Sequence, residues 1–208
     1  MQPHILKMLI RGEDETLDFK QSISSASKIA KTMVAFANHK GGKLLVGVRD
    51  NKTIAGVRTE DEKYMLDLAA TFFCKPEVRI HIDEWEVDGK LLLECTVFEG
   101  KDKPYSAKDE QGNWVTYIRV KDKSLLASKI VIGVLKRQNQ KTGTLIKYTS
   151  KEKALLDYLS INNKITLKQY TQMLNLSQYR ASRILVNLIV TGIIRSHNYE
   201  KTEFYTLS

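Results

Sequence analysis

The stretch FANHKGGKLLVGVRD, from Phe36 to Asp50, decides how the N-terminal part of the chain folds. Gly41 and Gly42 precede an apolar run, and Asp50 stands where that run ends. A P-loop has the pattern GxxxxGK followed by Ser or Thr, and its glycines lead into a helix. Here a helix is expected before the glycines and a strand after them, which is the reverse of the order in a P-loop. We therefore expect the glycines to turn the chain, and ATP is not an expected ligand.

The residues around this stretch predict alternating helices and strands. Apolar residues recur at helical spacing within residues 22–38 and again within residues 61–73, which indicates two amphipathic helices. The segment TLDFK, residues 16–20, alternates like a half-buried strand, and residues 43–48 read as a buried strand. We expect the glycine pair to bring these two strands side by side.

After Pro76 the pattern becomes richer in strands. Residues 78–87 and 90–98 are predicted to pair through a hairpin at Asp88-Gly89, and residues 114–120 predict a further strand. Residues 124–140 are expected to be helical. Helices and largely consecutive strands favour an α+β domain over residues 1–138.

The C-terminal part is predicted to be a separate, smaller domain. Residues 139–148 are polar and carry no periodicity, so they are expected to be a linker. In residues 149–208, capping boxes are predicted at Thr149 with Glu152 and at Thr166 with Gln169, and Ser177 is expected to cap a third helix. Two short strands follow. Three helices and a hairpin are typical of a winged helix-turn-helix domain.

Composition limits the class of protein. The 208 residues are 42% hydrophobic, and no apolar stretch reaches the roughly 18–20 residues of a membrane span. No signal-peptide pattern is present, so we expect a cytoplasmic protein without a membrane partner. Cys74 and Cys95 lack metal-ligand spacing and are expected to be buried thiols. Residues 139–208 hold 10 Lys/Arg against 4 Asp/Glu, which favours a polyanionic partner.

Three acidic residues form a candidate metal site. Glu13 and Asp18 flank the start of the TLDFK strand, and Asp50 closes the next strand, so pairing of the strands would allow the carboxylates to converge. Hard divalent cations prefer such oxygen ligands and assist phosphodiester hydrolysis. The alternative is that Glu13, Asp14 and Glu15 form a solvated acidic turn, while Asp50 is an ordinary turn residue before Asn51.

The segments EDETLDFK, AFANHKGGKLLVGVRDNKTIAGV and WVTYIRV resemble the Schlafen AlbA_2 domain, over roughly residues 10–125. In bacteria this domain is also described as a DNA-binding or "divergent AAA-4" domain. The resemblance implies an α+β fold associated with nucleic-acid binding. Bacterial members often join the domain to a winged helix.

The same resemblance implies a nuclease alternative. Related domains of animal Schlafen proteins cleave structured RNA with a metal ion and three acids, which match Glu13, Asp18 and Asp50 here. Asp18 departs from the pattern, which has the longer Glu at that position. The animal proteins also pair two such lobes, so this chain would need to form a homodimer to match them. Mg²⁺ or Mn²⁺ is implied for the nuclease alone.

The predicted third helix of the C-terminal domain supplies candidate DNA contacts. A recognition helix places its N-terminal residues against base edges in the major groove, while lysines elsewhere bind phosphates. No cofactor is required for that binding. The candidate residues are Gln178, Tyr179, Arg180, Ser182, Arg183 and Asn187 on the helix, with Lys168 and Lys201 for phosphates.

The leading interpretation is a nucleic-acid-binding protein, specifically a transcriptional regulator that binds double-stranded DNA. Two alternatives stay open: the metal-dependent nuclease of RNA or DNA, and a winged helix that serves dimerisation beside a ligand-sensing N-terminal domain.

Overall fold

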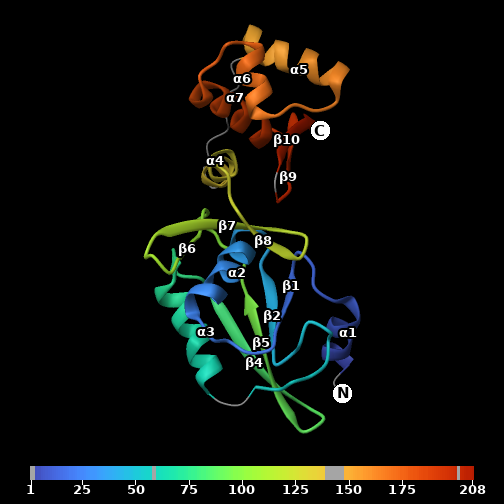
Figure 1. The fold of residues 1–208 in the computed structure, drawn as a ribbon, viewed down its shortest axis with the longest axis vertical. Helices are drawn as coiled ribbons and strands as arrows, with labels where there is room; N and C mark the ends of the chain where they lie inside the picture. Colours follow the sequence, from blue (N-terminus) through green and yellow to red (C-terminus); the bar gives the residue numbers. More distant parts are fainter. Residues whose placement is uncertain (1–2, 58–59, 139–147, 201) are drawn as a thin grey trace. The chain divides into compact units, whose positions relative to one another are not determined.

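The computed structural model describes residues 3–57, 60–138, 148–200 and 202–208, and the chain divides into two compact units (Figure 1). The units run Met1–Leu126 and Ala127–Ser208. This division lies before helix α4 (Lys129–Gln138), whereas the sequence placed the limit after residue 138. The physical reason is that α4 packs on helix α7 (Gln178–Val190) of the second unit. Residues 139–147 of the expected linker lie outside the described part of the chain.

The N-terminal unit is built on a four-stranded sheet with the order β1-β2-β5-β4. The strands are β1 (Leu17–Lys20), β2 (Gly42–Val46), β5 (Lys90–Val97) and β4 (Ile80–Val87). β1 and β2 are parallel, with Asp18 opposite Leu44, and the other pairs are antiparallel. The expectation that the glycine pair brings the two strands together is confirmed, as is the β4–β5 hairpin.

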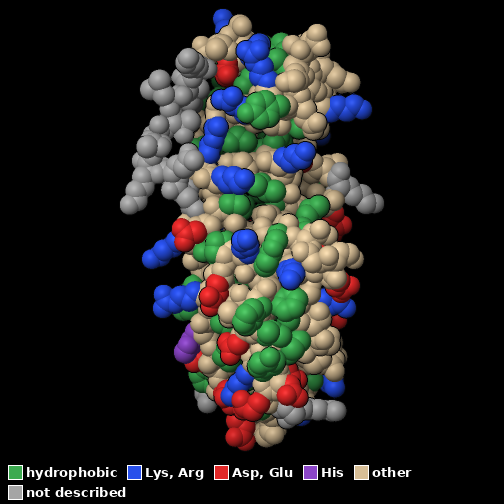
Figure 2. All heavy atoms as spheres, turned by 90° about the vertical axis from the view of Figure 1, so that its left-hand side faces the viewer, with side chains coloured by type: hydrophobic (Ala, Val, Ile, Leu, Met, Phe, Trp, Pro, Cys, Tyr) green, Lys and Arg blue, Asp and Glu red, His purple; other side chains and the backbone are tan. Residues whose placement is uncertain are grey.

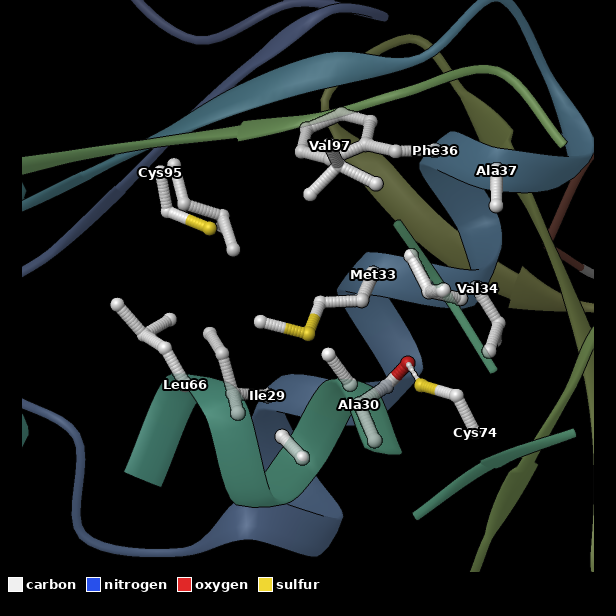
Figure 3. Close-up of a cluster of buried hydrophobic side chains, with 14 of the residues drawn as sticks. Ile29, Ala30, Met33, Val34, Phe36, Ala37, Leu66, Cys74, Cys95 and Val97 are labelled. Atoms are coloured by element: carbon white, nitrogen blue, oxygen red, sulfur yellow. Dashed lines mark hydrogen bonds between the residues drawn. The ribbon is translucent and has the colours of Figure 1, made fainter. Parts of the chain in front are cut away.

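Helices cover both faces of this sheet. α1 (Pro3–Arg11) packs on one face through Ile5, Met8 and Leu9. α2 (Ala26–Asn38) and α3 (Asp61–Phe72) pack on the other, where the largest apolar core lies (Figure 3). α2 is buried almost all round because a second sheet covers its far side. That sheet comprises β3 (Cys74–Lys75), β6 (Ser106–Lys108), β7 (Trp114–Val120) and β8 (Lys123–Leu126).

Two local expectations differ from the structure. Residues 124–140 were expected to form one helix, but β8 pairs with β7 through Leu126, and α4 begins only after Ser128. The Ser128 hydroxyl accepts a hydrogen bond from the backbone N–H of Val131 at 3.2 Å, which caps the start of α4. The other difference is α1, a helix that was not expected from the sequence. Both cysteines are free and buried, as expected.

The C-terminal unit combines helices with a β-hairpin. After α4 come α5 (Ser150–Asn162), α6 (Leu167–Met173) and α7, then the antiparallel strands β9 (Ile194–Asn198) and β10 (Glu203–Leu207). The capping boxes at Thr149 and Thr166 are confirmed, and Ser177 caps α7. Ile130 of α4 belongs to the same apolar core as the other three helices. No helix in the described ranges is long and apolar enough to cross a membrane.

Candidate acidic site and nucleic-acid interface

The asparagine before the glycine pair fixes the end of α2 to the second sheet. Asn38 is 6% exposed, and its side-chain nitrogen donates to the carbonyl oxygens of Tyr105 and Tyr117, each at 2.8 Å. Its side-chain oxygen accepts from the backbone N–H of Tyr105 at 2.7 Å. A buried amide with all these partners stabilises one arrangement of the two elements. Asn38 therefore has a structural role.

The glycine pair allows close packing between the end of α2 and β5. Gly41 has φ +76°, and a Cβ there would lie 2.6 Å from the carbonyl oxygen of Val97. A Cβ on Gly42 would lie 2.6 Å from the ring of Phe36. The backbone N–H of Gly41 is already donated to the carbonyl oxygen of Phe36 at 2.9 Å. Steric fit thus accounts for both glycines, and Gly41 offers no free N–H to a phosphate.

Glu13 closes part of the outer edge of β1. The carbonyl groups of Thr16 and Lys20 accept hydrogen bonds from the β2 side. Backbone N–H and C=O groups point to alternate edges of a strand from one residue to the next, so those of Leu17 and Phe19 point away from β2. The Glu13 Oε1 atom accepts the backbone N–H of Phe19 at 2.8 Å. This carboxylate therefore satisfies a backbone N–H group at the edge of the sheet.

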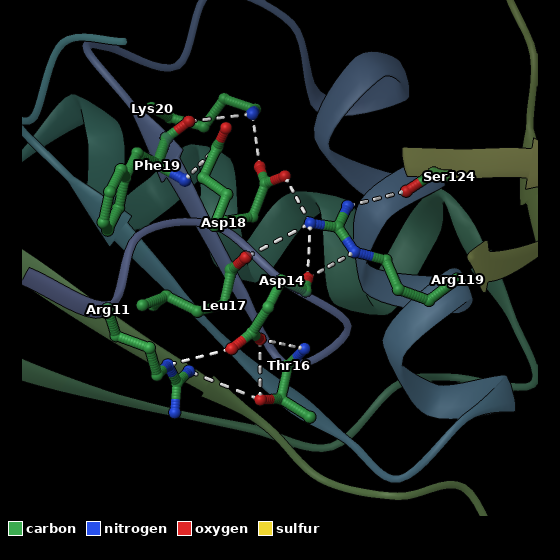
Figure 4. Close-up of polar contacts among 10 residues, drawn as sticks. Arg11, Asp14, Thr16, Leu17, Asp18, Phe19, Lys20, Arg119 and Ser124 are labelled. Carbon is green, nitrogen blue, oxygen red and sulfur yellow. Dashed lines mark hydrogen bonds and ion pairs between the residues drawn. The ribbon is translucent and has the colours of Figure 1, made fainter. Parts of the chain in front are cut away.

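Asp18 lies on the opposite side of β1 from Leu17 and Phe19, and it pairs with two cations (Figure 4). Its Oδ1 atom accepts from Arg119 Nη2 at 2.9 Å, and its Oδ2 atom pairs with Lys20 Nζ. The Arg119 side chain is 1% exposed and also donates to the carbonyl oxygens of Asp14 and Leu17. The pair joins β7 of the second sheet to β1 of the first.

Asp50 lies apart from this network. It stands four residues beyond the end of β2, in an exposed turn where the N–H of Lys52 bonds to the carbonyl oxygen of Arg49 at 2.8 Å. Within the described residues, no three His, Cys, Asp or Glu side chains are grouped so as to hold a metal ion. The structure therefore gives Glu13, Asp18 and Asp50 three separate surroundings.

Arg119 is the buried partner of the acidic motif, although no sequence pattern was taken to predict it. A signal was present, because WVTYIRV places an arginine in a strand whose neighbours are apolar. A long, always charged side chain at such a position needs a buried acidic partner or carbonyl oxygens. Asp18 supplies the former and Asp14 and Leu17 supply the latter.

Four of the candidate DNA contacts form an exposed surface on α7. Gln178, Tyr179, Arg180 and Arg183 are exposed in the first two turns, and the Arg183 guanidinium lies 5.8 Å from the centre of the Tyr179 ring. Lys168 is exposed on α6. Lys201 lies outside the described residues.

The two remaining candidates are partly covered by α4. Ser182 and Asn187 are half-buried, and the Arg137 guanidinium of α4 donates to the side-chain oxygen of Asn187. Gly133 allows this approach, since a Cβ there would lie 3.0 Å from a methyl carbon of Val186. A groove of about 600 Å³ remains between α4 and α7. Its cationic lining residues are Lys129, Arg137 and Arg183.

Most of the N-terminal unit matches a known protein family. Residues 13–128 match the family described as Schlafen, AlbA_2. No curated protein matches the chain.

The solved structures similar to the chain include the following two. The DIP2311 protein from Corynebacterium diphtheriae is 17% identical with a TM-score of 0.49, and the match covers 74% of this chain and 38% of that protein. The N-terminal domain of a RecG-related protein from Nitrosomonas europaea is 20% identical with a TM-score of 0.44, covering 70% of this chain and 95% of that domain.

Proposed function

The chain belongs to the Schlafen AlbA_2 family through residues 13–128, and from this premise we propose that it is a DNA-binding transcriptional regulator. In this proposal α5, α6, α7 and the β9–β10 hairpin form a winged helix-turn-helix domain, and α7 is the recognition helix. The family's association with nucleic acid supports a polyanionic partner. The arrangement of the C-terminal unit supports duplex DNA.

The distribution of charge is the observation that carries the proposal. Residues 1–126 hold 20 Lys/Arg and 20 Asp/Glu, whereas residues 127–208 hold 13 and 4. The whole surplus of nine positive charges therefore lies in the unit that contains α7. Lys and Arg side chains are prominent on the side of this unit seen in Figure 2, with few acidic side chains among them. Neutralising DNA phosphates with such side chains releases counterions and drives association.

The exposed start of α7 is suited to reading bases. Arg180 and Arg183 can each bond in a bidentate manner to guanine, and Gln178 to adenine. Lys129 and Arg137 of α4 extend the basic surface beside the helix and suit neighbouring phosphates. The half-buried Asn187, which Arg137 engages, is the weakest of the candidate base contacts.

The test is binding of fluorescently labelled duplex DNA to the full chain, measured by anisotropy over a salt series. Arg180→Ala and Arg183→Ala should each weaken binding by about 1–3 kcal/mol if they contact bases, with relaxed sequence preference. Both side chains are exposed, so circular dichroism and thermal unfolding should remain unchanged.

Lys153→Ala is the matched control, because it removes one exposed positive charge from α5 of the same unit. It should bind duplex DNA nearly as the wild type does. Equal affinity of the wild type and the Arg180→Ala/Arg183→Ala double variant at every salt concentration would refute DNA recognition by α7.

A further inference from the structure

Helix α1 of the N-terminal unit carries a basic outer stripe. His4, Lys7 and Arg11 are exposed and follow the spacing i, i+3, i+7, so they lie along one side of the helix. Ile5 and Leu9 bury the opposite side against the sheet. This helix precedes residues 13–128, so the stripe is a feature of this chain beyond the family match.

Lys43, at the start of β2, joins this stripe across a hollow. The hollow has a volume of about 240 Å³, and its lining residues are His4, Lys7, Met8, Arg11 and Lys43. No carboxylate belongs to that lining set. Three cationic side chains and one histidine therefore surround a space large enough for a small anion.

A buried carboxylate holds Lys43 and His4 in place. Glu94 is 1% exposed, and it pairs with Lys43 Nζ and with His4 Nε2, the latter at 2.6 Å. The Trp85 indole N–H also donates to it, at 2.9 Å. These contacts orient Lys43 and His4 at the base of the hollow. Arg11 pairs with a different carboxylate, because its Nε atom lies 2.9 Å from Asp14 Oδ2. Lys7 is the cation of this hollow that has no acidic partner among the described residues.

A second hollow extends the groove past the glycine pair. It measures about 280 Å³, shares Arg11 and Lys43 with the first, and adds Lys40. Glu99 is the one carboxylate in its described lining, and Lys103 Nζ pairs with it at 2.7 Å. The two hollows together thus form a groove bordered by His4, Lys7, Arg11, Lys40 and Lys43.

Ion pairs within the protein explain His4, Lys43 and Arg11, but they do not explain Lys7 and Lys40. Lys7 and Arg11 are four residues apart on α1, a spacing at which like charges destabilise a helix. Lys7 and Lys40 form no ion pair with any described residue. The N-terminal unit as a whole has equal numbers of acidic and basic residues, so its net charge does not impose a basic groove. A bound anion would compensate the charges of Lys7 and Lys40.

We propose that this groove binds phosphate groups, either those of a nucleic acid strand or those of a free polyphosphate. From residue 4 to residue 11, α1 extends about 10 Å, which exceeds a single phosphate group and suits neighbouring ones. Lysine acts as a point charge toward phosphate, and arginine offers paired donors. The recognition is by side chains, since the Gly41 N–H is bonded within the protein. This site lies in the N-terminal unit and is independent of the function proposed for α7.

The experiment is isothermal titration of the full chain with inorganic pyrophosphate at low ionic strength. Wild type should bind, and the Lys7→Gln/Lys40→Gln double variant should bind at least tenfold more weakly. Lys28→Gln/Lys121→Gln is the matched control, because it removes two exposed lysines of the same unit that do not line the groove. Thermal unfolding should be alike in all three proteins.

A second arm identifies the source of the phosphate. A single-stranded oligodeoxynucleotide is titrated into the Arg180→Ala/Arg183→Ala protein, with and without the two groove substitutions. A loss of affinity caused by Lys7→Gln/Lys40→Gln assigns the groove to nucleic acid, and binding of pyrophosphate alone assigns it to free polyphosphate. The proposal is overturned if wild type binds neither ligand, or if the groove variant and the lysine control bind alike. Neither result affects the test of α7 with duplex DNA.

Discussion

The buried pair of Asp18 and Arg119 gives the acidic motif a role in stability that requires no reaction. Arg119 is engaged by one carboxylate and two backbone carbonyl groups, and it also packs 4.8 Å from the centre of the Phe36 ring. Removing one member of a buried pair leaves the other charge without compensation. Loss of function after substitution of Asp18 would therefore not by itself identify a catalytic residue.

Asp18→Ala should lower the free energy of unfolding of the N-terminal unit by about 3–5 kcal/mol, because the Arg119 guanidinium stays buried without its carboxylate. Both tryptophans, Trp85 and Trp114, lie in this unit, so urea unfolding followed by tryptophan fluorescence reports on it alone. Asp50→Ala is the control and should stay within about 0.5 kcal/mol of wild type, since Asp50 is exposed. Equal stability of the two variants would contradict the structural role of Asp18.

Glu94 should make the N-terminal unit sensitive to acid. Burial alone would raise its pKa, but the hydrogen bonds from Lys43 and His4 outweigh burial and hold the pKa below its usual value of 4.5. As the pH falls, Glu94 binds a proton in the unfolded chain before it does so in the folded chain. The contribution of Glu94 to the free energy of unfolding is therefore complete well above pH 4.5 and is lost as the pH falls below that value.

Glu94→Gln should consequently be less stable than wild type near pH 7, with the difference shrinking as the pH falls below about 4.5. Urea midpoints from tryptophan fluorescence at several pH values measure this change. Parallel pH profiles for the two proteins would rule out Glu94 as the titrating group.

Elements with long periodic patterns were predictable, and short ones were not. α2 and α7 each combine thirteen residues of helical periodicity with a serine cap, at Ser25 and Ser177. β3 has two residues and β6 has three, too few for any alternation to be visible. The boundary between β8 and α4 was not predictable either, because apolar residues continue from one element into the next between Lys123 and Gln138.

The candidate site was predictable only in part for a related reason. The acids stand out in the sequence, but the partner of Asp18 lies 101 residues further along the chain. Pairing over that separation depends on β7 of the second sheet coming close to β1. No local pattern contains this information. The expected pairing of the two strands was correct, but it does not bring the three carboxylates together.

α4 should stabilise the C-terminal unit. A fragment of residues 127–208 should unfold cooperatively, whereas a fragment of residues 139–208, which begins at the limit read from the sequence, should be less stable by at least about 2 kcal/mol. The reason is that the shorter fragment loses Ile130, which is 2% exposed in the core, and the contact between Arg137 and Asn187. Thermal unfolding by circular dichroism compares them. Identical stability would show that α4 is not part of this folding unit.

At the scale of the whole molecule, the boundary between the two units separates the apolar cores and also separates the neutral part of the chain from the basic part. The core residues between Ile5 and Ala107 belong to the first unit, and those between Ile130 and Tyr205 belong to the second. The charge surplus follows this division only when α4 is counted with the second unit. The sequence indicated a basic C-terminal part, but the full asymmetry became visible once the structure set the limit at residue 126.

The edge of β1 also bears on how copies of this protein can associate. An open edge strand invites a strand from another chain, which extends the sheet and leads to uncontrolled aggregation. Here the Glu13 carboxylate, the Arg119 guanidinium and the Lys20 ammonium group occupy backbone positions that an added strand would need. Continuation of the sheet from one copy into the next is therefore blocked at this edge, and any two-lobed assembly has to form through other surfaces.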